Sequence, residues 1–276
     1  MRIYECADYR AMSRRAASLI AAQVVLKPEG VLGLATGSTP IGLYSQLVEW
    51  YKQGDLSFAG IRSVNLDEYL GLAPTHEQSY RYFMQTNLFD HIDIKPENTH
   101  VLNGLAADPD AECAAYDQLI RELGGVDLQL LGMGHNGHIA FNEPGDNFGL
   151  GTHVVSLSER TIDANQRFFE NRDQVPRQAL SMGIKSIMGA RRILVVVSGE
   201  DKADAVCKAV TGPVTDQVPA SVLQLHPDVT LVGDTAALSK LKEAGVPVCG
   251  EPADRSLTWN RVSYPGTCAL TERSWS

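Results

Sequence analysis

The chain has 276 residues, of which 44% are hydrophobic and 21% are charged, and its formal net charge is −9. This composition is typical of a folded globular protein with one large domain or two small ones, and it excludes an intrinsically disordered chain. The negative charge argues against nucleic acid or an anionic membrane surface as the main partner, so an anionic ligand would need a local cluster of donors.

Five cysteines, at positions 6, 113, 207, 249 and 268, are odd in number and far apart. Their spacing suggests neither a disulfide framework nor a metal site, and reduced thiols are typical of the cytosol. The first residues contain no signal-peptide core, and no apolar run is long enough to span a bilayer. We therefore expect a cytoplasmic protein with no metal site and no contact with a membrane.

Strands alternate with helices from the start of the chain. Asp8 is a candidate N-cap for an amphipathic helix that runs to about Leu26, and residues 31–35 are typical of a short buried strand. The turn of residues 36–42 is rich in Gly, Ser and Thr, and a helical pattern follows it. Such a turn directs backbone N–H groups toward an anion. Because both the Walker and the dinucleotide spacings are missing, the turn is either a phosphate loop or a helix start without a ligand.

The next predicted strand, residues 62–66, ends in two adjacent carboxylates, Asp67 and Glu68. An ionised carboxylate at the end of a buried strand loses hydration, so its presence needs a reason. Adjacent side chains on an extended chain point to opposite faces, and we therefore expect only one of the two to reach a shared site. A pair of exposed loop acids, or Asp67 as a helix cap, is the alternative.

Helices at about residues 77–89 and 110–123 precede a strand at residues 126–131. A glycine-rich segment follows this strand, and its polar side chains are His135, Asn136, His138 and Glu143. Titratable groups on a turn at the carboxyl end of a strand stand where open α/β sheets bind their ligands. A polar surface turn with solvated histidines is the alternative for any one of them.

The second half of the chain continues the alternation. A strand at 152–157 precedes an excursion over roughly residues 158–180, which we expect to act as a helical lid. Residues 191–197 are the clearest buried strand, and the helix after it carries Lys202 in its first turn. That end of a helix disfavours a cation, so an anion held there would explain Lys202, although solvated surface lysines are common.

A short helix at 218–225 and a strand at 229–234 complete the pattern, which fades beyond about residue 245. The alternation predicts an α/β fold of a single domain, with a Rossmann-like, mostly parallel sheet and helices on both faces. We expect this domain to cover residues 1–245 and residues 246–276 to form an irregular tail. The strand ends after Ala35, Leu66, Leu131 and Val197 should meet at one edge, because carboxyl ends of parallel strands open on the same side.

Five segments resemble the glucosamine-6-phosphate deaminase family, and in order and spacing they cover about residues 1–240. The run from Gly137 to Pro144 is highly specific to that family, whereas the chain from about Lys242 does not align with it. The matching segments are Leu34-Ala-Thr-Gly-Ser-Thr-Pro40, Asn65-Leu-Asp-Glu-Tyr-Leu-Gly71, Gly134-His-Asn-Gly-His-Ile-Ala-Phe-Asn-Glu-Pro144, Asn165-Gln-Arg-Phe-Phe169 and Leu223-Gln-Leu-His-Pro227.

The resemblance implies conversion of glucosamine 6-phosphate and water to fructose 6-phosphate and ammonia in amino-sugar catabolism, with no metal or organic cofactor. It implies that Asp67 moves a proton from carbon 2 to carbon 1, that His138 opens the sugar ring, and that Glu143 orients and charges His138. Asn136 stands where some family members carry aspartate, so it can hold His138 but cannot carry a proton. The residues implied for the substrate phosphate are Gly37, Ser38, Thr39, Arg167 and Lys202.

Allosterically activated hexamers of the family carry basic and hydroxyl residues just after the Asn-Glu-Pro run. Asp146 and Val155 in that region suit a second phosphate poorly, so we expect a non-allosteric enzyme that is either a monomer or a homo-oligomer.

The alternatives are a 6-phosphogluconolactonase-like hydrolase, a galactosamine 6-phosphate deaminase and a non-catalytic sugar-phosphate sensor. The segments Asp67-Glu-Tyr69 and Phe141-Asn-Glu-Pro144 favour a deaminase over the lactonase. The intact set of Asp67, His138 and Glu143 argues against the sensor. The motifs leave the choice between glucosamine and galactosamine open.

Overall fold

The computed structural model describes residues 1–145, 148, 150–157, 159, 162, 163, 166, 169 and 171–250. A sheet of eight strands forms its centre, in the order β11-β1-β10-β9-β6-β2-β3-β5, and every neighbouring pair is parallel. The strands are β1 (Arg2–Cys6), β2 (Val31–Leu34), β3 (Arg62–Asn65), β5 (Thr99–His100), β6 (Leu128–Leu131), β9 (Ile193–Val197), β10 (Val229–Asp234) and β11 (Cys249–Gly250).

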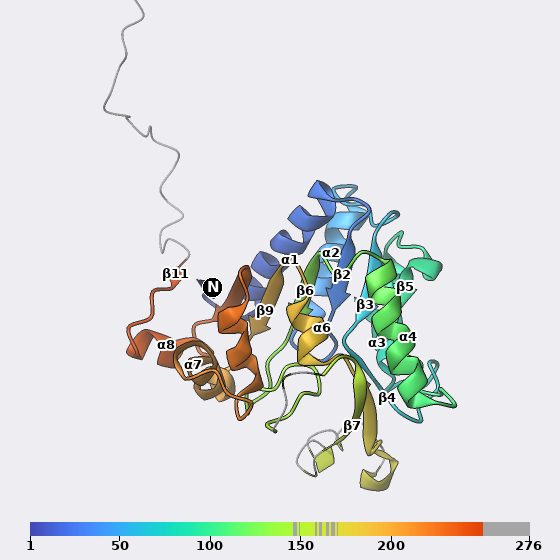
Figure 1. Cartoon of the computed structure of the whole chain (residues 1–276). Helices are drawn as coiled ribbons and strands as arrows, with labels where there is room; N and C mark the ends of the chain where they lie inside the picture. The colour runs from blue at the N-terminus through green and yellow to red at the C-terminus, as the bar shows by residue number, and fades with distance from the viewer. Residues whose placement is uncertain are drawn as a thin grey trace, which may run out of the picture.

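Helices cover both faces of this sheet (Figure 1). A parallel sheet covered on both faces is the fold that the alternation of elements predicted, and the prediction is confirmed. The α-helices described are α1 (Tyr9–Leu26), α2 (Ile41–Lys52), α3 (Tyr80–Asn87), α4 (Pro109–Glu122), α6 (Ile184–Met188), α7 (Ala203–Thr211) and α8 (Ser239–Glu243), with short 3-10 turns at Phe89–His91, Pro96–Asn98, Arg172–Gln174, Glu200–Lys202 and Pro219–Leu225.

Local chemistry explains the best-predicted elements. All residues of β2, β6, β9 and β10 are buried, which is why these strands appear as nearly continuous apolar runs in the sequence. The Asp8 side chain accepts a hydrogen bond of 2.7 Å from the backbone N–H of Ala11, and so it caps α1 as predicted. Gly124 and Gly125, with φ of 85° and 82°, follow α4 in the left-handed conformation that stops a helix.

A second, antiparallel sheet was not predicted. It has the order β4-β8-β7 and consists of β4 (Asp67–Tyr69), β8 (Gln178–Ser181) and β7 (His153–Ser156). Asp67 is therefore the first residue of a strand, and residues 178–180 are paired in a sheet and do not belong to a lid. β4 consists of two acidic residues and one tyrosine, so it has no run of apolar residues that would indicate a strand in the sequence.

The ends of the chain differ from expectation as well. β1 and the two-residue β5 were not predicted, and β11 pairs with β1 inside the segment expected to be irregular. Most of the predicted lid, with Asn165 and Arg167, and the tail from residue 251 lie outside the described residues. None of the described helices has the length and apolar character needed to cross a membrane.

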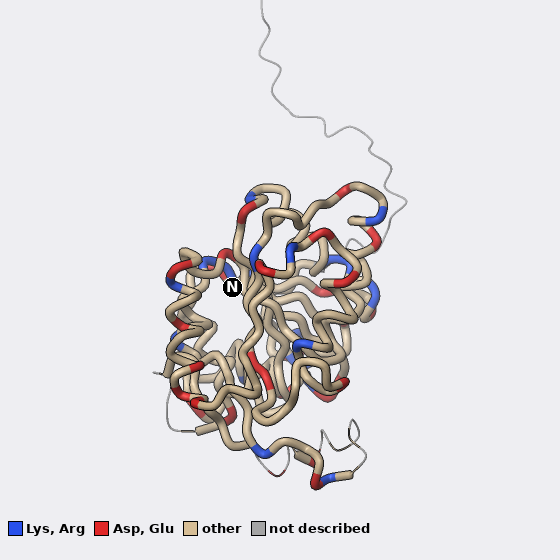
Figure 2. The backbone as a smooth tube through the Cα atoms, turned by 90° about the vertical axis from the view of Figure 1, so that its right-hand side faces the viewer, with Lys and Arg blue, Asp and Glu red and all other residues tan. Residues whose placement is uncertain are grey.

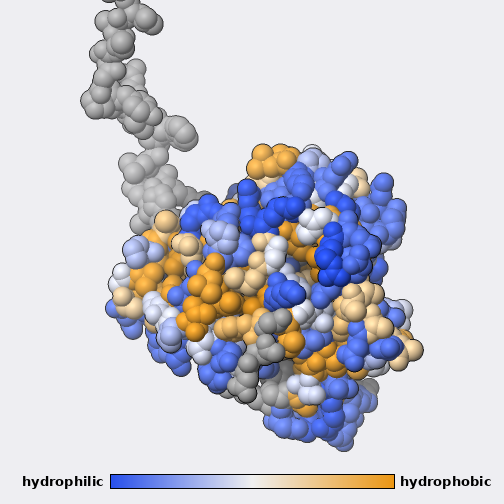
Figure 3. Space-filling model, in the orientation of Figure 1, coloured by the Kyte–Doolittle hydropathy of each residue, from blue (hydrophilic) through white to orange (hydrophobic). Residues whose placement is uncertain are grey.

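The described surface mixes polar and apolar character. Acidic and basic residues are interspersed along the backbone in Figure 2. Apolar side chains gather in Figure 3 around α7 and the Pro219–Leu225 turn, where Leu225 is exposed.

Candidate active site

The four segments singled out in the sequence follow four strands that are neighbours in the sheet. The order β9-β6-β2-β3 is uninterrupted, and these strands are parallel, so their carboxyl ends lie at one edge (Figure 1). The turn at residues 36–42, the acids at 67 and 68, the glycine-rich segment 132–145 and Lys202 all start from this edge. The edge therefore gathers every described candidate residue.

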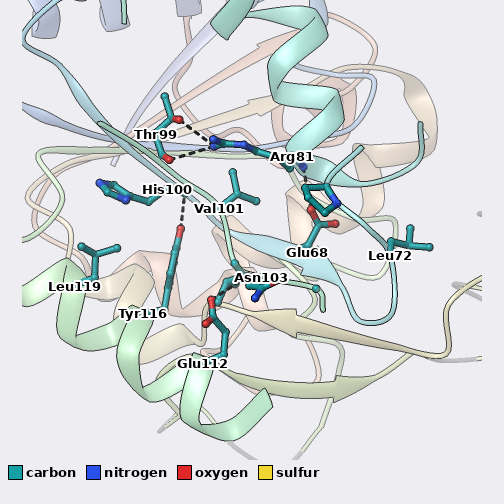
Figure 4. A pocket seen from close by; sticks show the side chains of 13 residues that line it. Glu68, Leu72, Arg81, Thr99, His100, Val101, Asn103, Glu112, Tyr116 and Leu119 are labelled. Atoms are coloured by element: carbon teal, nitrogen blue, oxygen red, sulfur yellow. Dashed lines mark hydrogen bonds between the residues drawn. The ribbon is translucent and has the colours of Figure 1, made fainter. Parts of the chain in front are cut away.

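The two adjacent acids are both buried, which excludes the alternative of exposed loop acids. The exposed fractions of Asp67 and Glu68 are 8% and 2%. The Glu68 carboxylate accepts hydrogen bonds from the backbone N–H groups of Tyr69, Tyr80 and Arg81 at 2.8–2.9 Å, and so it holds the start of α3. Glu68 also lines a cavity of about 340 Å³ beside α3 and α4 (Figure 4), and Asp67 is not among its lining residues.

Burial sets the proton affinity of Asp67. Loss of hydration first, and then the nearby charge of Glu68, raise the pKa of Asp67 from 3.8 to about 8. Asp67 lies opposite Ser181 in the β4–β8 ladder, so its place on the backbone is fixed by the second sheet. A buried carboxyl that titrates near neutral pH has the properties of a general base.

The His138 ring lies against the backbone of Gly134. A Cβ atom at Gly134 would come within 2.2–2.4 Å of three ring atoms of His138, so only glycine leaves room for the imidazole. The chain turns back at this point through Gly137, with φ of 83°, and through Ala140, whose φ of 50° is the only positive value for a non-glycine residue in the described part. This backbone conformation costs energy, and it sets the position of His138.

Glu143 and Asn136 lie beside His138. The Glu143 carboxylate has Oε1 at 3.6 Å from Nδ1 of His138, which is an ion-pair distance but too long for a hydrogen bond. Asn136 donates from its side-chain amide to Oε2 of Glu143 at 2.5 Å and accepts from the backbone N–H of His138 at 3.1 Å. Nδ1 of His138 is buried without a hydrogen-bond partner among the described residues, so a small movement of Glu143 would complete the pair.

Strand β8 connects this loop to Asp67. The hydroxyl oxygen of Ser181 accepts from the backbone N–H of Phe141 at 3.1 Å, and the carbonyl of Met182 accepts from the Asn142 amide at 2.9 Å. The backbone N–H of Met182 donates to the carbonyl of Leu66 at 2.7 Å. The strand that holds Asp67 and the loop that holds His138 are therefore fixed to the same element.

An aromatic cluster lies between the same two parts. The ring centroids of Tyr69 and Tyr80 are 4.8 Å apart, and that of Phe141 lies 5.9 Å from Tyr69 and 6.2 Å from Tyr80. Burial first, and then the charges of Tyr69 and Asp67, raise the pKa of Tyr80, so its phenol stays protonated close to Asp67.

The turn before α2 is partly exposed and is held by hydrogen bonds to Tyr9. Gly37 has φ of 92°, and α2 begins at Ile41, after the N-cap residue Pro40, without a side-chain cap. The Tyr9 hydroxyl lies 3.1–3.2 Å from the carbonyls of Ser38 and Thr39 and accepts from the N–H of Gly42 at 2.9 Å. Tyr9 thus holds the turn, while Gly37 and Ser38 stay exposed at a helix start that favours anions.

Lys202 lies at the end of the 3-10 turn that precedes α7, in the N-cap position of α7. Its Nζ is 3.2 Å from Nδ1 of His135, so the loops after β6 and β9 touch. The buried Asp234 accepts from the Ser198 hydroxyl and from the N–H of Gly199, and it holds the turn that leads to Lys202. Sequence reasoning missed Tyr9, Ser181 and Asp234, and also the contact of His135 with Lys202, because the partners lie far apart in the chain.

Among the described residues, no group of three or more His, Cys, Asp or Glu side chains has an arrangement that could hold a metal ion. The predicted phosphate ligand Arg167 lies outside the described residues. The other predicted residues are all described, and they start from the edge formed by the four strands.

Comparison with known proteins agrees with this arrangement. Residues 7–232 match the family model described as glucosamine-6-phosphate isomerases/6-phosphogluconolactonase. The glucosamine-6-phosphate deaminase of Lachnoclostridium phytofermentans is 62% identical over 232 residues, which cover 84% of this chain and 98% of that protein. The enzyme of the same name from Clostridioides difficile is 54% identical over 241 residues, which cover 87% of this chain and 97% of the relative.

Solved structures of related proteins have the same fold. A structure described as a monomeric glucosamine-6-phosphate deaminase has a TM-score of 0.85 and 48% identity, over 87% of this chain and 99% of that one. The 6-phosphogluconolactonase of Trypanosoma brucei has a TM-score of 0.70 at 18% identity, over 87% of this chain and 98% of that one, which shows a shared fold alone. From the family match and these identities, the chain belongs to the glucosamine-6-phosphate deaminase family.

Proposed function

We propose that this chain converts glucosamine 6-phosphate and water to fructose 6-phosphate and ammonia. The strongest support is the 62% identity to a glucosamine-6-phosphate deaminase over 98% of that protein, which makes a shared activity the simplest interpretation. The buried Asp67 and the His138–Glu143 pair, both anchored on β8, agree with this reaction. A lactone hydrolase would not need a carboxyl base with a pKa of about 8 beside a carbon acid.

Ring opening is the first step of the proposed reaction. His138 takes the proton of the hydroxyl at carbon 1 and returns a proton to the ring oxygen, which yields the open-chain aldehyde. Glu143 stabilises the imidazolium that forms between these transfers, and the Asn136 amide keeps the Glu143 carboxylate in place. Such a positioned proton transfer contributes roughly 10²–10⁴-fold to a rate.

Proton transfer between carbons follows. Asp67 removes the proton from carbon 2 of the aldehyde while the oxygen at carbon 1 takes up a proton from water, which gives an enolamine, and the Asp67 carboxyl then protonates carbon 1. The product is an iminium group at carbon 2. Water adds to this carbon and the C–N bond breaks, so ammonia leaves and the ketone of fructose 6-phosphate remains. The proton taken from water is released again when the iminium group is hydrolysed.

The phosphate is the group that holds the substrate at the edge. The exposed turn Gly37-Ser38-Thr39 offers backbone N–H groups and hydroxyls, and Lys202 offers a compact positive charge. Arg167 is proposed as a further ligand from the family resemblance. The overall charge of −9 would repel a phosphate dianion, so these local donors must provide the attraction.

The test of this function is an assay of three substrates with the purified protein. Glucosamine 6-phosphate should release ammonia and fructose 6-phosphate in equal amounts, and 6-phosphogluconolactone should be hydrolysed no faster than without protein. Galactosamine 6-phosphate measures the preference for the sugar epimer. Lactone hydrolysis without release of ammonia would contradict the proposal and favour the lactonase.

Kinetics without allosteric activation are part of the proposal. Val155 lies in the segment where a second phosphate would need donors, and a structurally similar relative is described as monomeric. The rate should therefore depend hyperbolically on glucosamine 6-phosphate, with or without N-acetylglucosamine 6-phosphate. A sigmoidal curve that the acetylated sugar phosphate makes hyperbolic would contradict this prediction.

Replacing Glu68 by Gln should shift the pH dependence of the reaction. Because the charge of Glu68 raises the pKa of Asp67, its removal lowers that pKa, and Asp67 becomes a free base at lower pH. The acidic limb of kcat/KM, expected near pH 8 in the wild type, should move toward lower pH. The amide oxygen of the introduced glutamine can keep the two bonds from the N–H groups of Tyr69 and Tyr80, whereas the bond from the N–H of Arg81 is lost, so circular dichroism and thermal unfolding must show that the variant is folded.

The matched control for this variant is Glu112→Gln. Glu112 lines the same cavity and accepts from the N–H of Asn103, but it is not among the groups that shift the pKa of Asp67 (Figure 4). Its replacement should leave the limb in place. An equal shift of the acidic limb in both variants, or no shift in Glu68→Gln, would show that the charge of Glu68 does not raise the pKa of Asp67.

A further inference from the structure

His135 lies between Lys202 and Asp201 at the edge of the sheet. Nδ1 of its ring is 3.2 Å from Nζ of Lys202, and Nε2 is 2.5 Å from Oδ2 of Asp201. The three side chains come from two different loops, since His135 follows β6 while Asp201 and Lys202 follow β9. The contact therefore fixes the position of Lys202 relative to the loop that carries His138.

The two partners determine where the proton of His135 is. An ammonium group has only donors, so Nδ1 of His135 must accept the hydrogen bond from Lys202. The ring proton is then on Nε2, and it points to the carboxylate of Asp201. In this arrangement the imidazole is neutral, and Lys202 keeps its full positive charge.

His135 also separates two opposite charges. Lys202 and Asp201 are neighbours in the chain, and their charged atoms are 4.0 Å apart, at the outer limit of an ion pair. A close ion pair between Lys202 and Asp201 would partly neutralise the Lys202 ammonium and weaken its attraction for another anion. His135 bonds to both groups and offers each a neutral partner.

Lys202 has the least exposed side chain of the three residues. The side chains of His135 and Asp201 are 54% and 56% exposed, whereas that of Lys202 is 16% exposed. A long and flexible lysine side chain loses much rotamer freedom when it binds a ligand. A lysine that is already restrained loses less, so its ligand binds more tightly.

We propose that His135 is a positioning residue for the phosphate group of the substrate, because it holds the ammonium of Lys202 in place and away from Asp201. This inference rests on the proposed function only in taking Lys202 as a phosphate ligand. His135 itself need not touch the substrate. Its loss should therefore weaken the binding of phosphate and leave the proton transfers of Asp67 and His138 unchanged.

The experiment compares His135→Leu and His135→Gln with the wild type. Leucine cannot accept a hydrogen bond, and we expect KM for glucosamine 6-phosphate to rise about 5- to 10-fold, while kcat stays within about twofold. A glutamine amide can accept from Lys202 and donate to Asp201, so His135→Gln should restore most of the KM. The control is His91→Leu, which removes another exposed histidine, one that bonds only to a backbone carbonyl of its own segment among the described residues.

Binding of inorganic phosphate, measured by thermal shift or calorimetry, makes the test independent of turnover. His135→Leu should weaken phosphate binding by a similar factor, and this result would support the inference even if the protein released no ammonia. An unchanged phosphate affinity in His135→Leu would overturn it. So would a fall in kcat at constant KM, or a loss that His135→Gln shares in full.

Discussion

Asp67→Asn should abolish turnover of glucosamine 6-phosphate, with kcat lowered by about 10²–10⁴-fold. The amide has the shape of the carboxyl but cannot take the proton from carbon 2. Asp67 is buried and lies opposite Ser181 in a regular ladder, so the exchange should leave the backbone unchanged. The affinity for inorganic phosphate should stay near that of the wild type, because the proposed phosphate ligands belong to other strands.

Initial rates of ammonia release and phosphate titrations of the same preparation check this result. A variant that keeps more than about a tenth of the wild-type kcat would show that Asp67 is not the base. A variant that loses phosphate binding together with kcat would point instead to a collapsed site.

The same variant should be more stable than the wild type at alkaline pH. The pKa of Asp67 is 3.8 in the reference state and about 8 in the folded protein, so its protonated form favours folding. This contribution is complete below about pH 4 and is lost as the pH rises toward 8. Asparagine resembles the protonated carboxyl at every pH, and so the variant keeps this contribution to stability at alkaline pH.

The free energy of unfolding of Asp67→Asn should thus exceed that of the wild type by an amount that grows from near zero at about pH 4 to the order of 5 kcal/mol above pH 8. Urea denaturation at several pH values measures this difference. A wild type that is as stable as Asp67→Asn at pH 9 would contradict the raised pKa.

Gly134→Ala should reduce kcat by about 10²-fold, because a displacement of a catalytic group by about 1 Å has that effect. The new methyl group would lie within 2.4 Å of the His138 ring, and the ring must move away from the position from which it reaches the sugar. The backbone N–H of Gly134 still bonds to the carbonyl of His138, so the loop itself should persist.

The matched control is Gly132→Ala in the same segment. A Cβ atom at Gly132 meets no atom within 4 Å, so this variant adds the same methyl group without the contact to His138. The two variants should differ by at least about tenfold in kcat if the position of the ring is what matters. Equal losses in both would mean that the segment tolerates no side chain at all.

Strong local signals explain which parts of the fold were predictable. The helix cap at Asp8 and the apolar runs of β2, β6, β9 and β10 depend on neighbouring residues, and the sequence shows them directly. β1 was missed because its pairing partner, β10, lies more than 200 residues away in the chain. The strand expected at residues 152–157 is present as β7, but β4, β8 and their pairing were missed, because β4 has only three residues and its partner β8 lies more than 100 residues away in the chain.

The candidate site also has a part that the sequence predicts and a part that only the fold shows. The motifs locate Asp67, His138 and Glu143 in the sequence, and parallel strands imply that they meet at one edge. The burial of Glu68, the contact of His135 with Lys202 and the role of Gly134 depend on residues brought together by the fold. A pattern along the chain cannot show such contacts. The position of Arg167 is still a prediction.

A crystal structure with an open-chain amino-alditol 6-phosphate would locate the substrate, because this analogue has the carbon chain of glucosamine 6-phosphate but no carbonyl to react. We expect its phosphate at the Gly37-Ser38-Thr39 turn and Lys202, with carbon 2 within about 3.5 Å of the Asp67 carboxylate and carbon 1 toward His138. An analogue bound in the cavity beside Glu68, or one that leaves Asp67 and His138 without a common ligand, would contradict the proposed reaction.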